Sequence, residues 1–348
     1  MKFTYSIPTK ILFGPGSFND LATTPLPGKK ALVVITAGKS MRANGYLDRL
    51  IDMLDKQGIG HALFDKILPN PVLRHVHEGA ALAREQGCDF VIGLGGGSSI
   101  DSAKSIAVMA KNPGDYWDYI SGGSGKGQPL VNGALPIVAI ATTAGTGTEA
   151  DPWTVITKED TNEKIGFGCA ETFPVLSVVD PEMMSSMPKG LTAATGMDAL
   201  THAIEGYTTK GAWEMTDMFN LKAIEVIARS LRDAVENKPE GREGMALGQY
   251  LTGMGFSNCG LGIVHSMAHG LGALYDTPHG VANAIILPTV MEYNAPCTGT
   301  KFRDIAIAMG VTGVEDMSQD EYRKAAVDAV KKLSADVGIP ADLKEILK

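Results

Sequence analysis

The sequence lacks several features that mark special classes of protein. Its 348 residues include only four cysteines, widely spaced and without a CxxC pair, so we expect a reduced, intracellular protein with no disulfide framework. No apolar run approaches the roughly 18 residues that a membrane-spanning helix needs. Residues 1–10, MKFTYSIPTK, have no apolar core of a signal peptide. We therefore expect a cytoplasmic protein with no membrane partner.

Positive charge is also scarce. The formal net charge is −8, and no long run of Lys and Arg is present, so a nucleic-acid partner is not expected. The hydrophobic fraction of 44% and the charged fraction of 20% are ordinary for a globular protein. Because 348 residues exceed what one hydrophobic core usually serves, we expect two domains.

The two halves of the chain differ in their hydrophobic pattern. The first half alternates short apolar runs, such as ALVVI (31–35), with helical stretches, such as residues 45–58. This alternation predicts a parallel sheet covered by helices on both faces. Later in the chain, helical spacing dominates. We therefore predict an α/β domain with a parallel sheet over residues 1–183 and an all-α domain over 184–348.

Two glycine-rich loops follow predicted strands. In GLGGGSSID (93–101), glycines allow close backbone approach to a ligand, and the start of the following helix offers free N–H groups to a phosphate. The spacing is not GxGxxG, so a tight turn capped by Ser98 or Ser99 is the alternative. ATTAGTGTEAD (141–151) places hydroxyls and glycines where open α/β sheets bind ligands, or it is a polar surface turn. Together the loops favour a dinucleotide site.

The end of the strand predicted at residues 31–35 bears on the choice of nucleotide. In NAD-binding folds an acid there commonly holds the adenosine ribose. Here VVITAGKS (33–40) places Gly38 and Lys39 after the strand and contains no acid. The sequence therefore leaves room for the phosphate of NADP, unless this loop never touches the cofactor.

Histidines gather in the second half of the chain. Asp198 and His202 in TGMDALTHAIEGY are four residues apart, and so are His265 and His269 in GIVHSMAHGLGALYDTPHG, where His279 follows. Residues four apart share a helical face. A lone helical histidine is usually a satisfied core or surface group, but this set predicts a site for Fe, Zn, Ni or Co rather than Ca or Mg. Periodicity leaves open which of His265, His269 and His279 bind the metal.

Four motifs together resemble the iron-containing (group III) alcohol dehydrogenase family: GGGSSIDSAK, TTAGTGTE, GMDALTHAIE and HSMAHGLGALYDTPHG. The resemblance runs from about residue 5 to the end. It implies a dehydroquinate synthase-like fold, with the active site between a Rossmann-like domain and a helical domain. It also implies Fe²⁺, or Zn²⁺ in its place, NAD(P), a small alcohol or aldehyde as substrate, and a homodimer or larger homo-oligomer. After about residue 190 the chain is most similar to members that act on lactaldehyde and 1,2-propanediol.

Carried across residue by residue, the resemblance assigns roles to the histidine cluster. The metal ligands fall on Asp198, His202, His265 and His279. His269 falls on a histidine near the nicotinamide that is not a ligand, where it would act as a catalytic proton relay.

The resemblance also assigns nucleotide and substrate residues. The cofactor contacts fall on Asn70, Gly96, Gly97, Ser98, Asp101, Thr142, Thr143 and Lys164. Phe256 falls on an aromatic residue of the substrate pocket. Gly38 stands where NAD-preferring members carry an acid. Asp151 and Trp153 stand where the lactaldehyde-acting members have smaller neutral residues, so we expect them to influence the substrate.

Other readings remain open. Family members usually continue for one or two helices beyond the position of Lys348, so a missing tail would expose apolar surface of the helical domain. A general short-chain alcohol or butanol dehydrogenase is the alternative activity, and a non-catalytic protein that binds nucleotide and metal is the alternative class. Lyases similar to dehydroquinate synthase share the fold but need a basic cluster, whereas mostly apolar and small residues surround these histidines.

Overall fold

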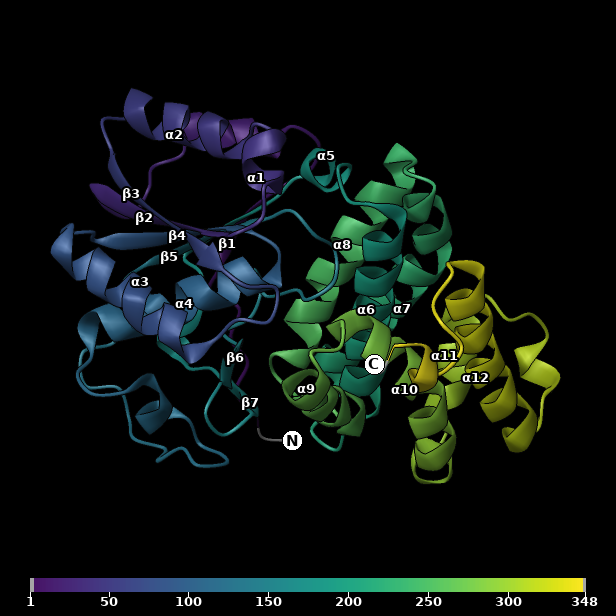
Figure 1. Cartoon of the computed structure of the whole chain (residues 1–348). Helices are drawn as coiled ribbons and strands as arrows, with labels where there is room; N and C mark the ends of the chain where they lie inside the picture. The colour runs from purple at the N-terminus through teal and green to yellow at the C-terminus, as the bar shows by residue number, and fades with distance from the viewer. Residues whose placement is uncertain (1–2, 347–348) are drawn as a thin grey trace. The chain divides into compact units, whose positions relative to one another are not determined.

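The computed structural model describes residues 3–346, which form two compact units (Figure 1). The α/β unit comprises residues 7–142 and 148–186. The helical unit comprises residues 3–6, 143–147 and 187–346. The α/β character of the first part and the helical character of the second confirm the fold class predicted from the hydrophobic pattern.

The α/β unit is built on a six-stranded sheet with the strand order β1-β8-β5-β4-β2-β3, and every pairing in it is parallel. Its strands are β1 (Lys10–Phe13), β2 (Lys30–Thr36), β3 (Gly60–Ile67), β4 (Phe90–Gly95), β5 (Ile137–Ala141) and β8 (Leu176–Val179). The inner strands β4, β5 and β8 are buried throughout, because helices cover both faces of a parallel sheet.

Two hydrophobic cores flank the sheet, and successive strand residues alternate between them. Val33 and Ile35 face one core, whereas Leu32 and Val34 face the other, as a period of two requires. The helices of this unit are α1 (Ser40–Ala43), α2 (Tyr46–Lys56), α3 (Leu73–Glu85), α4 (Gly97–Lys111) and α5 (Pro181–Met184). The first core includes residues of α1, α2 and α5, and the second includes residues of α3 and α4 (Figure 1).

The chain order of the strands reverses beside β2. β2 pairs with β3 on one side and with β4 on the other, and the following strands continue away from β4. The loops after β2 and β4 therefore open at the point where open α/β sheets bind ligands. Gly38 and Gly96 lie in these two loops.

Four strands were not among those we predicted. They are β1, β8 and the antiparallel hairpin of β6 (Thr154–Lys158) and β7 (Glu163–Phe167). The hairpin turn contains Asn162 at φ 53°, a conformation that Asn tolerates better than most residues. These strands are short, and β1, β6 and β7 contain charged or polar residues, so they lack the continuous apolar run of a buried strand.

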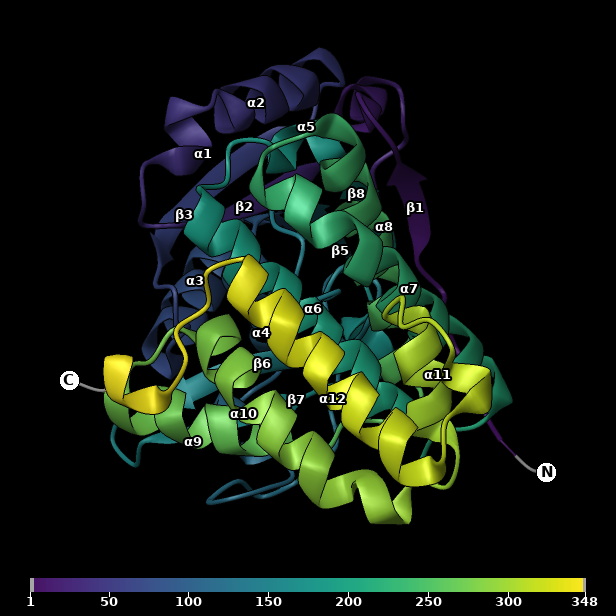
Figure 2. The same ribbon diagram turned by 90° about the vertical axis from the view of Figure 1, so that its right-hand side faces the viewer.

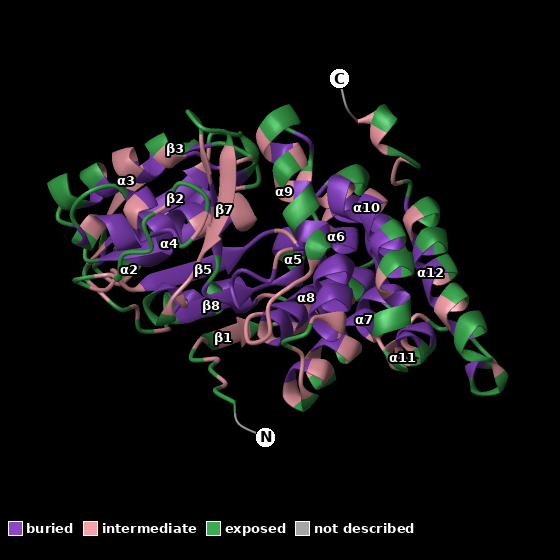
Figure 3. Cartoon of the chain, turned by 90° about the horizontal axis from the view of Figure 1, so that it is seen from below, coloured by how far each residue is buried: buried purple, intermediate pink, exposed green. Residues whose placement is uncertain are grey.

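The helical unit contains seven α-helices in the described chain. They are α6 (Lys189–Thr208), α7 (Glu214–Val235), α8 (Pro239–Phe256), α9 (Ile263–Tyr275), α10 (His279–Asn294), α11 (Lys301–Ala308) and α12 (Gln319–Asp336). α6 packs against α7, α8 and α10 and is buried along most of its length (Figure 3). α12 packs against α10 and α11 (Figure 2). No helix within residues 3–346 is long and apolar enough to cross a membrane.

A short segment of the predicted second glycine loop packs with the helical unit. Residues 143–147 belong to that unit, although Thr142 and Thr148 on either side belong to the α/β unit. The Gly147 N–H donates to Gln249 Oε1 on α8 at 2.8 Å. A Cβ on Gly145 would lie 2.8 Å from Thr195 on α6. Glycine is therefore needed at Gly145 for close backbone packing.

Candidate metal centre and nucleotide loops

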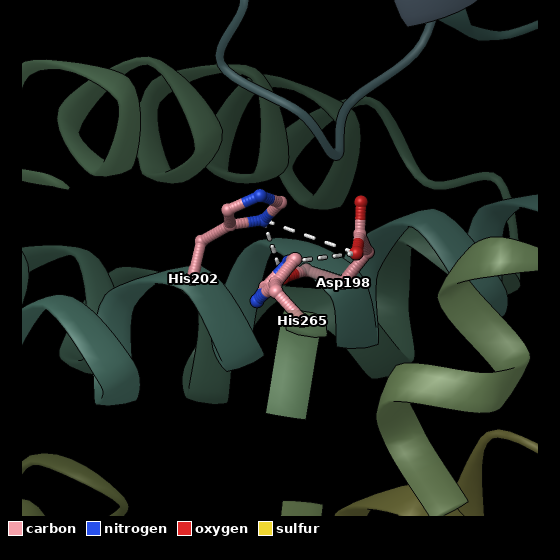
Figure 4. A group of neighbouring side chains, drawn as sticks. All are labelled: Asp198, His202 and His265. Atoms are coloured by element: carbon pink, nitrogen blue, oxygen red, sulfur yellow. Dashed lines mark hydrogen bonds and ion pairs between the residues drawn. The ribbon is translucent and has the colours of Figure 1, made fainter. Parts of the chain in front are cut away.

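Three imidazoles of the helical unit converge on one carboxylate oxygen of Asp198. Asp198 and His202 lie one turn apart on α6, His265 lies in the first turn of α9, and His279 is the first residue of α10. Asp198 Oδ1 lies 3.8 Å from His202 Nδ1, 3.7 Å from His265 Nε2 and 3.5 Å from His279 Nε2. Figure 4 shows Asp198 and the first two histidines. Three helices thus bring together the four residues predicted as metal ligands.

The arrangement fits a transition-metal ion. Asp198, His202 and His265 are all buried, and each offers one ligand atom within 4.8 Å of the others. His265 Nε2 is buried and has no hydrogen-bond partner within the described chain, which is costly unless something else satisfies it. Imidazole nitrogens with one carboxylate are donors that suit Fe²⁺ or Zn²⁺.

Burial and neighbouring charges shift the pKa values of the proposed ligands in different directions. Burial alone would raise the pKa of Asp198, but the neighbouring His202, His279 and His265 hold it well below its usual range. Burial, followed by repulsion from His265, lowers the pKa of His202 to about 4. Burial also opposes a charge on His265, yet Asp198 and Glu205 raise its pKa to about 9. At neutral pH Asp198 and His202 are ready to bind a metal, whereas His265 must first release a proton.

Aromatic rings border the cluster. Phe256, the predicted substrate-pocket residue, is buried and stacks on His202 with ring centroids 4.9 Å apart. The His269 ring centroid lies 6.4 Å from that of His265 and 5.4 Å from that of His279. His269 is therefore beside the cluster and is not part of the buried group of three. Its role as a proton relay stays a prediction.

Two buried polar residues near the cluster were missed by the sequence analysis. Glu205 Oε2 lies 2.5 Å from His265 Nδ1. Asn283 Nδ2 donates to Asp198 Oδ1 at 2.7 Å and lies 3.1 Å from His279 Nε2. Glu205 is seven residues after Asp198 and Asn283 is four after His279, so both share a helical face with a predicted ligand. That spacing was the available signal.

The N-terminus of α4 is open, as the phosphate-binding prediction requires. Its N-cap residue is Gly96, which makes no side-chain capping bond, and the helix begins at Gly97. The alternative of a cap by Ser98 or Ser99 is wrong, because both serines lie inside the helix. The first N–H groups of α4 are thus without a side-chain cap, in the geometry that binds phosphate groups.

Other predicted cofactor residues meet near this helix end. Ser98 Oγ donates to the Pro69 carbonyl at 2.5 Å, next to Asn70, and Lys164 Nζ donates to Asn70 Oδ1 at 2.9 Å. The Thr142 N–H donates to the Gly95 carbonyl at 2.9 Å. Segments after β3, β4 and β5 and the strand β7 therefore form one polar group in the α/β unit. Thr143 differs, since it belongs to the segment that packs with the helical unit.

Asp151 and Trp153, predicted to influence the substrate, are placed differently from each other. Asp151 is 2% exposed, and its carboxylate accepts from Lys104 Nζ at 3.2 Å and from the Trp153 N–H at 2.6 Å. Burial raises the pKa of Asp151 to about 7 against the opposing charge of Lys104. Trp153 is 39% exposed. The Asp151 carboxylate therefore has partners inside the α/β unit.

Asp101, a predicted cofactor residue, also has internal partners. Its carboxylate accepts from Thr148 Oγ1 at 2.7 Å and from the Val155 N–H at 2.9 Å. Asp101 thus binds Thr148 and Val155, which lie at the start of the segment 148–186 of the α/β unit. Its predicted contact with the nucleotide stays a prediction.

Comparison with known proteins identifies the family. Residues 8–181 match the model of the iron-containing alcohol dehydrogenases, and residues 192–346 match that of the Fe-containing alcohol dehydrogenase family, C-terminal. Lactaldehyde reductase of Escherichia coli (strain K12) is 48% identical over 322 residues, which cover 91% of this chain and 82% of that protein. 1,3-Propanediol dehydrogenase of Klebsiella pneumoniae is 41% identical over 350 residues, 99% of this chain and 88% of the relative.

Solved structures agree with the sequence relatives. The crystal structure of a 1,3-propanediol oxidoreductase superposes with a TM-score of 0.90 at 41% identity, covering 99% of this chain and 89% of the other. The two family models together span nearly the whole chain. The protein therefore belongs to the iron-containing alcohol dehydrogenase family and is an oxidoreductase of alcohols and aldehydes.

Proposed function

We propose that this enzyme interconverts lactaldehyde and 1,2-propanediol, with a nicotinamide nucleotide as the hydride carrier. The observation that carries the proposal is the convergence of three imidazoles on Asp198 within 3.8 Å. The 48% identity to a lactaldehyde reductase supports the choice of substrate. The 41% identity to a 1,3-propanediol dehydrogenase supports a second candidate, a dehydrogenase of other short alcohols or diols.

The proposed metal ligands are Asp198, His202, His265 and His279. When bound, Fe²⁺ supplies Lewis acidity toward the oxygen of the alcohol or aldehyde. Four protein ligands leave room for a substrate only if the ion accepts five or six ligands, which favours Fe²⁺ over a closed tetrahedral zinc site.

The surrounding residues have separate proposed roles. Asp198 stays ionised and His202 stays neutral at pH 7, which keeps both ready to bind the metal. Phe256 closes one side of the centre with an apolar ring and excludes water there. His269 is assigned the proton relay, because an imidazole beside the centre can donate or accept a proton.

The nucleotide is proposed to bind at the carboxyl ends of the parallel strands. Its phosphates would take the open N–H groups at Gly96, Gly97 and Ser98. Lys164 and Asn70, already paired at 2.9 Å, would contribute a positive charge and an amide beside them. Gly38, at the reversal of strand order and without a nearby acid on its loop, favours NADP over NAD.

The test is the oxidation of NADH and of NADPH after anaerobic reconstitution with Fe²⁺. Lactaldehyde, 3-hydroxypropionaldehyde and butyraldehyde are compared by kcat/KM, with a chelator-treated sample as control. Chelator-sensitive turnover with the highest kcat/KM for lactaldehyde is expected. A higher kcat/KM for butyraldehyde would instead establish the short-chain alcohol alternative. Turnover that survives full removal of the metal would contradict the proposed centre.

A further inference from the structure

Glu205 connects the metal centre to the start of a neighbouring helix. It lies on α6, is 4% exposed, and projects to the N-terminus of α9. Its Oε1 accepts from the Val264 N–H at 2.7 Å. Its Oε2 accepts from the His265 N–H at 3.3 Å and lies 2.5 Å from His265 Nδ1. One carboxylate thus caps α9 and holds the imidazole of a proposed ligand.

The chemistry of this contact determines which nitrogen of His265 can bind a metal. An ionised carboxylate only accepts hydrogen bonds, so Nδ1 must carry a proton and donate it to Glu205. A neutral ring then keeps the lone pair on Nε2. Nε2 is the buried atom that faces Asp198 Oδ1 at 3.7 Å and has no hydrogen-bond partner within the described chain. In many metal sites, the ring nitrogen of the histidine that does not bind the metal donates its N–H to a carboxylate in this way.

The backbone at Gly262 makes the close approach possible. A Cβ on Gly262 would lie 2.5 Å from Glu205 Oε1, closer than carbon and oxygen tolerate. Gly262 is also the N-cap of α9 and offers no side-chain cap of its own. Glu205 therefore takes both the place and the role of a capping side chain, at the one turn of α9 that carries His265.

We propose that Glu205 is a positioning residue of the metal centre, which fixes the tautomer and orientation of His265. The inference rests on the proposed metal site. In this proposal Glu205 acts through the imidazole of His265 and is not itself a ligand. With Asp198 and His202, Glu205 would be the third residue of α6 that contributes to the metal centre.

The first test is Glu205→Gln, which keeps the size but replaces one acceptor by an amide donor. Either the amide N–H₂ faces the Val264 N–H, or it donates to His265 Nδ1 and leaves the proton on Nε2. We expect the affinity for Zn²⁺, measured by competition with a chromogenic chelator, to fall about 10- to 100-fold. The absorption bands of bound Co²⁺ should also shift, which a loss of stability alone would not cause.

Asp180→Asn is the matched control. Asp180 is a buried carboxylate that accepts from the N–H groups of Gly16, Phe18 and Glu182 at 3.0–3.1 Å. This variant should lower the melting temperature and leave the Zn²⁺ affinity and the Co²⁺ spectrum unchanged. Gly262→Ala is the second probe, because it displaces the Glu205 carboxylate without removing its charge. It too should weaken Zn²⁺ binding, even if Glu205→Gln does not fold.

The outcomes are distinct. Weaker Zn²⁺ binding in both Glu205→Gln and Gly262→Ala, with unchanged Zn²⁺ binding in Asp180→Asn, supports the proposal that Glu205 positions His265. Affinity within twofold of the wild type in a folded Glu205→Gln or Gly262→Ala protein would overturn the inference and leave the metal site intact. A wild-type protein that binds neither Zn²⁺ nor Co²⁺ would overturn the proposed metal site and this inference together.

Discussion

At the scale of single residues, identical side chains in this site differ in their chemistry because their neighbours differ. His202 and His265 have ring centroids only 3.9 Å apart. Burial lowers the pKa of His202 to about 4, whereas two carboxylates raise that of His265 to about 9. A third histidine, His269, lies outside the buried group. Substitutions of single histidines should therefore have different effects.

Replacement of His265 by alanine should remove metal and activity together. The variant loses one imidazole ligand and the contact of that imidazole with Glu205, so we expect a loss of metal affinity above about 100-fold. The measurement is metal content by elemental analysis after dialysis, alongside turnover. A variant that retains one equivalent of metal would exclude His265 from the ligands.

Replacement of His269 by alanine should keep the metal and slow turnover. If His269 relays the proton, kcat should fall by about 10²- to 10⁴-fold, the usual contribution of a positioned acid or base. The wild-type pH profile of kcat should contain a limb that the variant lacks. Identical pH profiles for the two proteins would rule out the relay.

Replacement of Gly38 by aspartate should shift the preference toward NAD. A Cβ at this position meets only Thr36 Oγ1, at 3.6 Å, so the fold should tolerate the change. The new carboxylate would accept from the ribose hydroxyls of NAD and repel the phosphate of NADP. The ratio of kcat/KM for NADPH to that for NADH should fall about tenfold, or about 1.4 kcal/mol. An unchanged ratio would show that this loop does not contact the ribose.

At the scale of elements, the placement of the segment 143–147 depends on backbone geometry. Gly147 has φ +65°, and a Cβ there would lie 2.8 Å from backbone atoms of Gln249 and Gly253 on α8. No side chain can be added without moving the segment or the helix. Glycine at this position thus allows the loop to lie against α8.

Replacement of Gly147 by alanine should therefore destabilise the protein. We expect the free energy of unfolding in urea to fall by more than about 2 kcal/mol, from backbone strain and the contact with α8 together. Gly45→Ala is the control, since Gly45 has φ +69° with nothing within 4 Å of a Cβ. It should show only the conformational cost of about 1–2 kcal/mol. Equal losses in both variants would mean that the contact with α8 is unimportant.

At the scale of the whole molecule, the proposed metal ties together helices that are distant in sequence. Its ligands come from α6, α9 and α10, so an ion that binds only the folded state must stabilise that packing. At a free Zn²⁺ concentration of 100 Kd, the gain in the free energy of unfolding should be about 2.7 kcal/mol.

The measurement is thermal unfolding of the wild type with and without Zn²⁺ in a metal-buffered solution. The midpoint should rise with Zn²⁺ and return to its starting value when a chelator is added. His265→Ala should show no rise, which controls for ions bound elsewhere. An equal rise in that variant would place the stabilising ion outside the proposed centre.

The sequence by itself determined the features that depend on neighbours along the chain. Apolar strands alternating with helices predicted the α/β fold, and a spacing of four placed Asp198 and His202 on one helical face. The glycines before α4 predicted an open helix end. These inferences work because helical and extended geometries set distances between residues only a few positions apart.

Only the tertiary structure decided which distant residues meet. The packing of α10 against both α6 and α9 brought His265 and His279 within 3.7 Å of Asp198 and left His269 outside the buried group. Tertiary packing also placed the Glu205 carboxylate against His265 Nδ1. It joined residues 143–147 to the helical unit, and it brought the Asp151 carboxylate to Lys104 Nζ. No local periodicity encodes such contacts, because the distance between two helices is set by how their side chains pack and not by their separation in sequence.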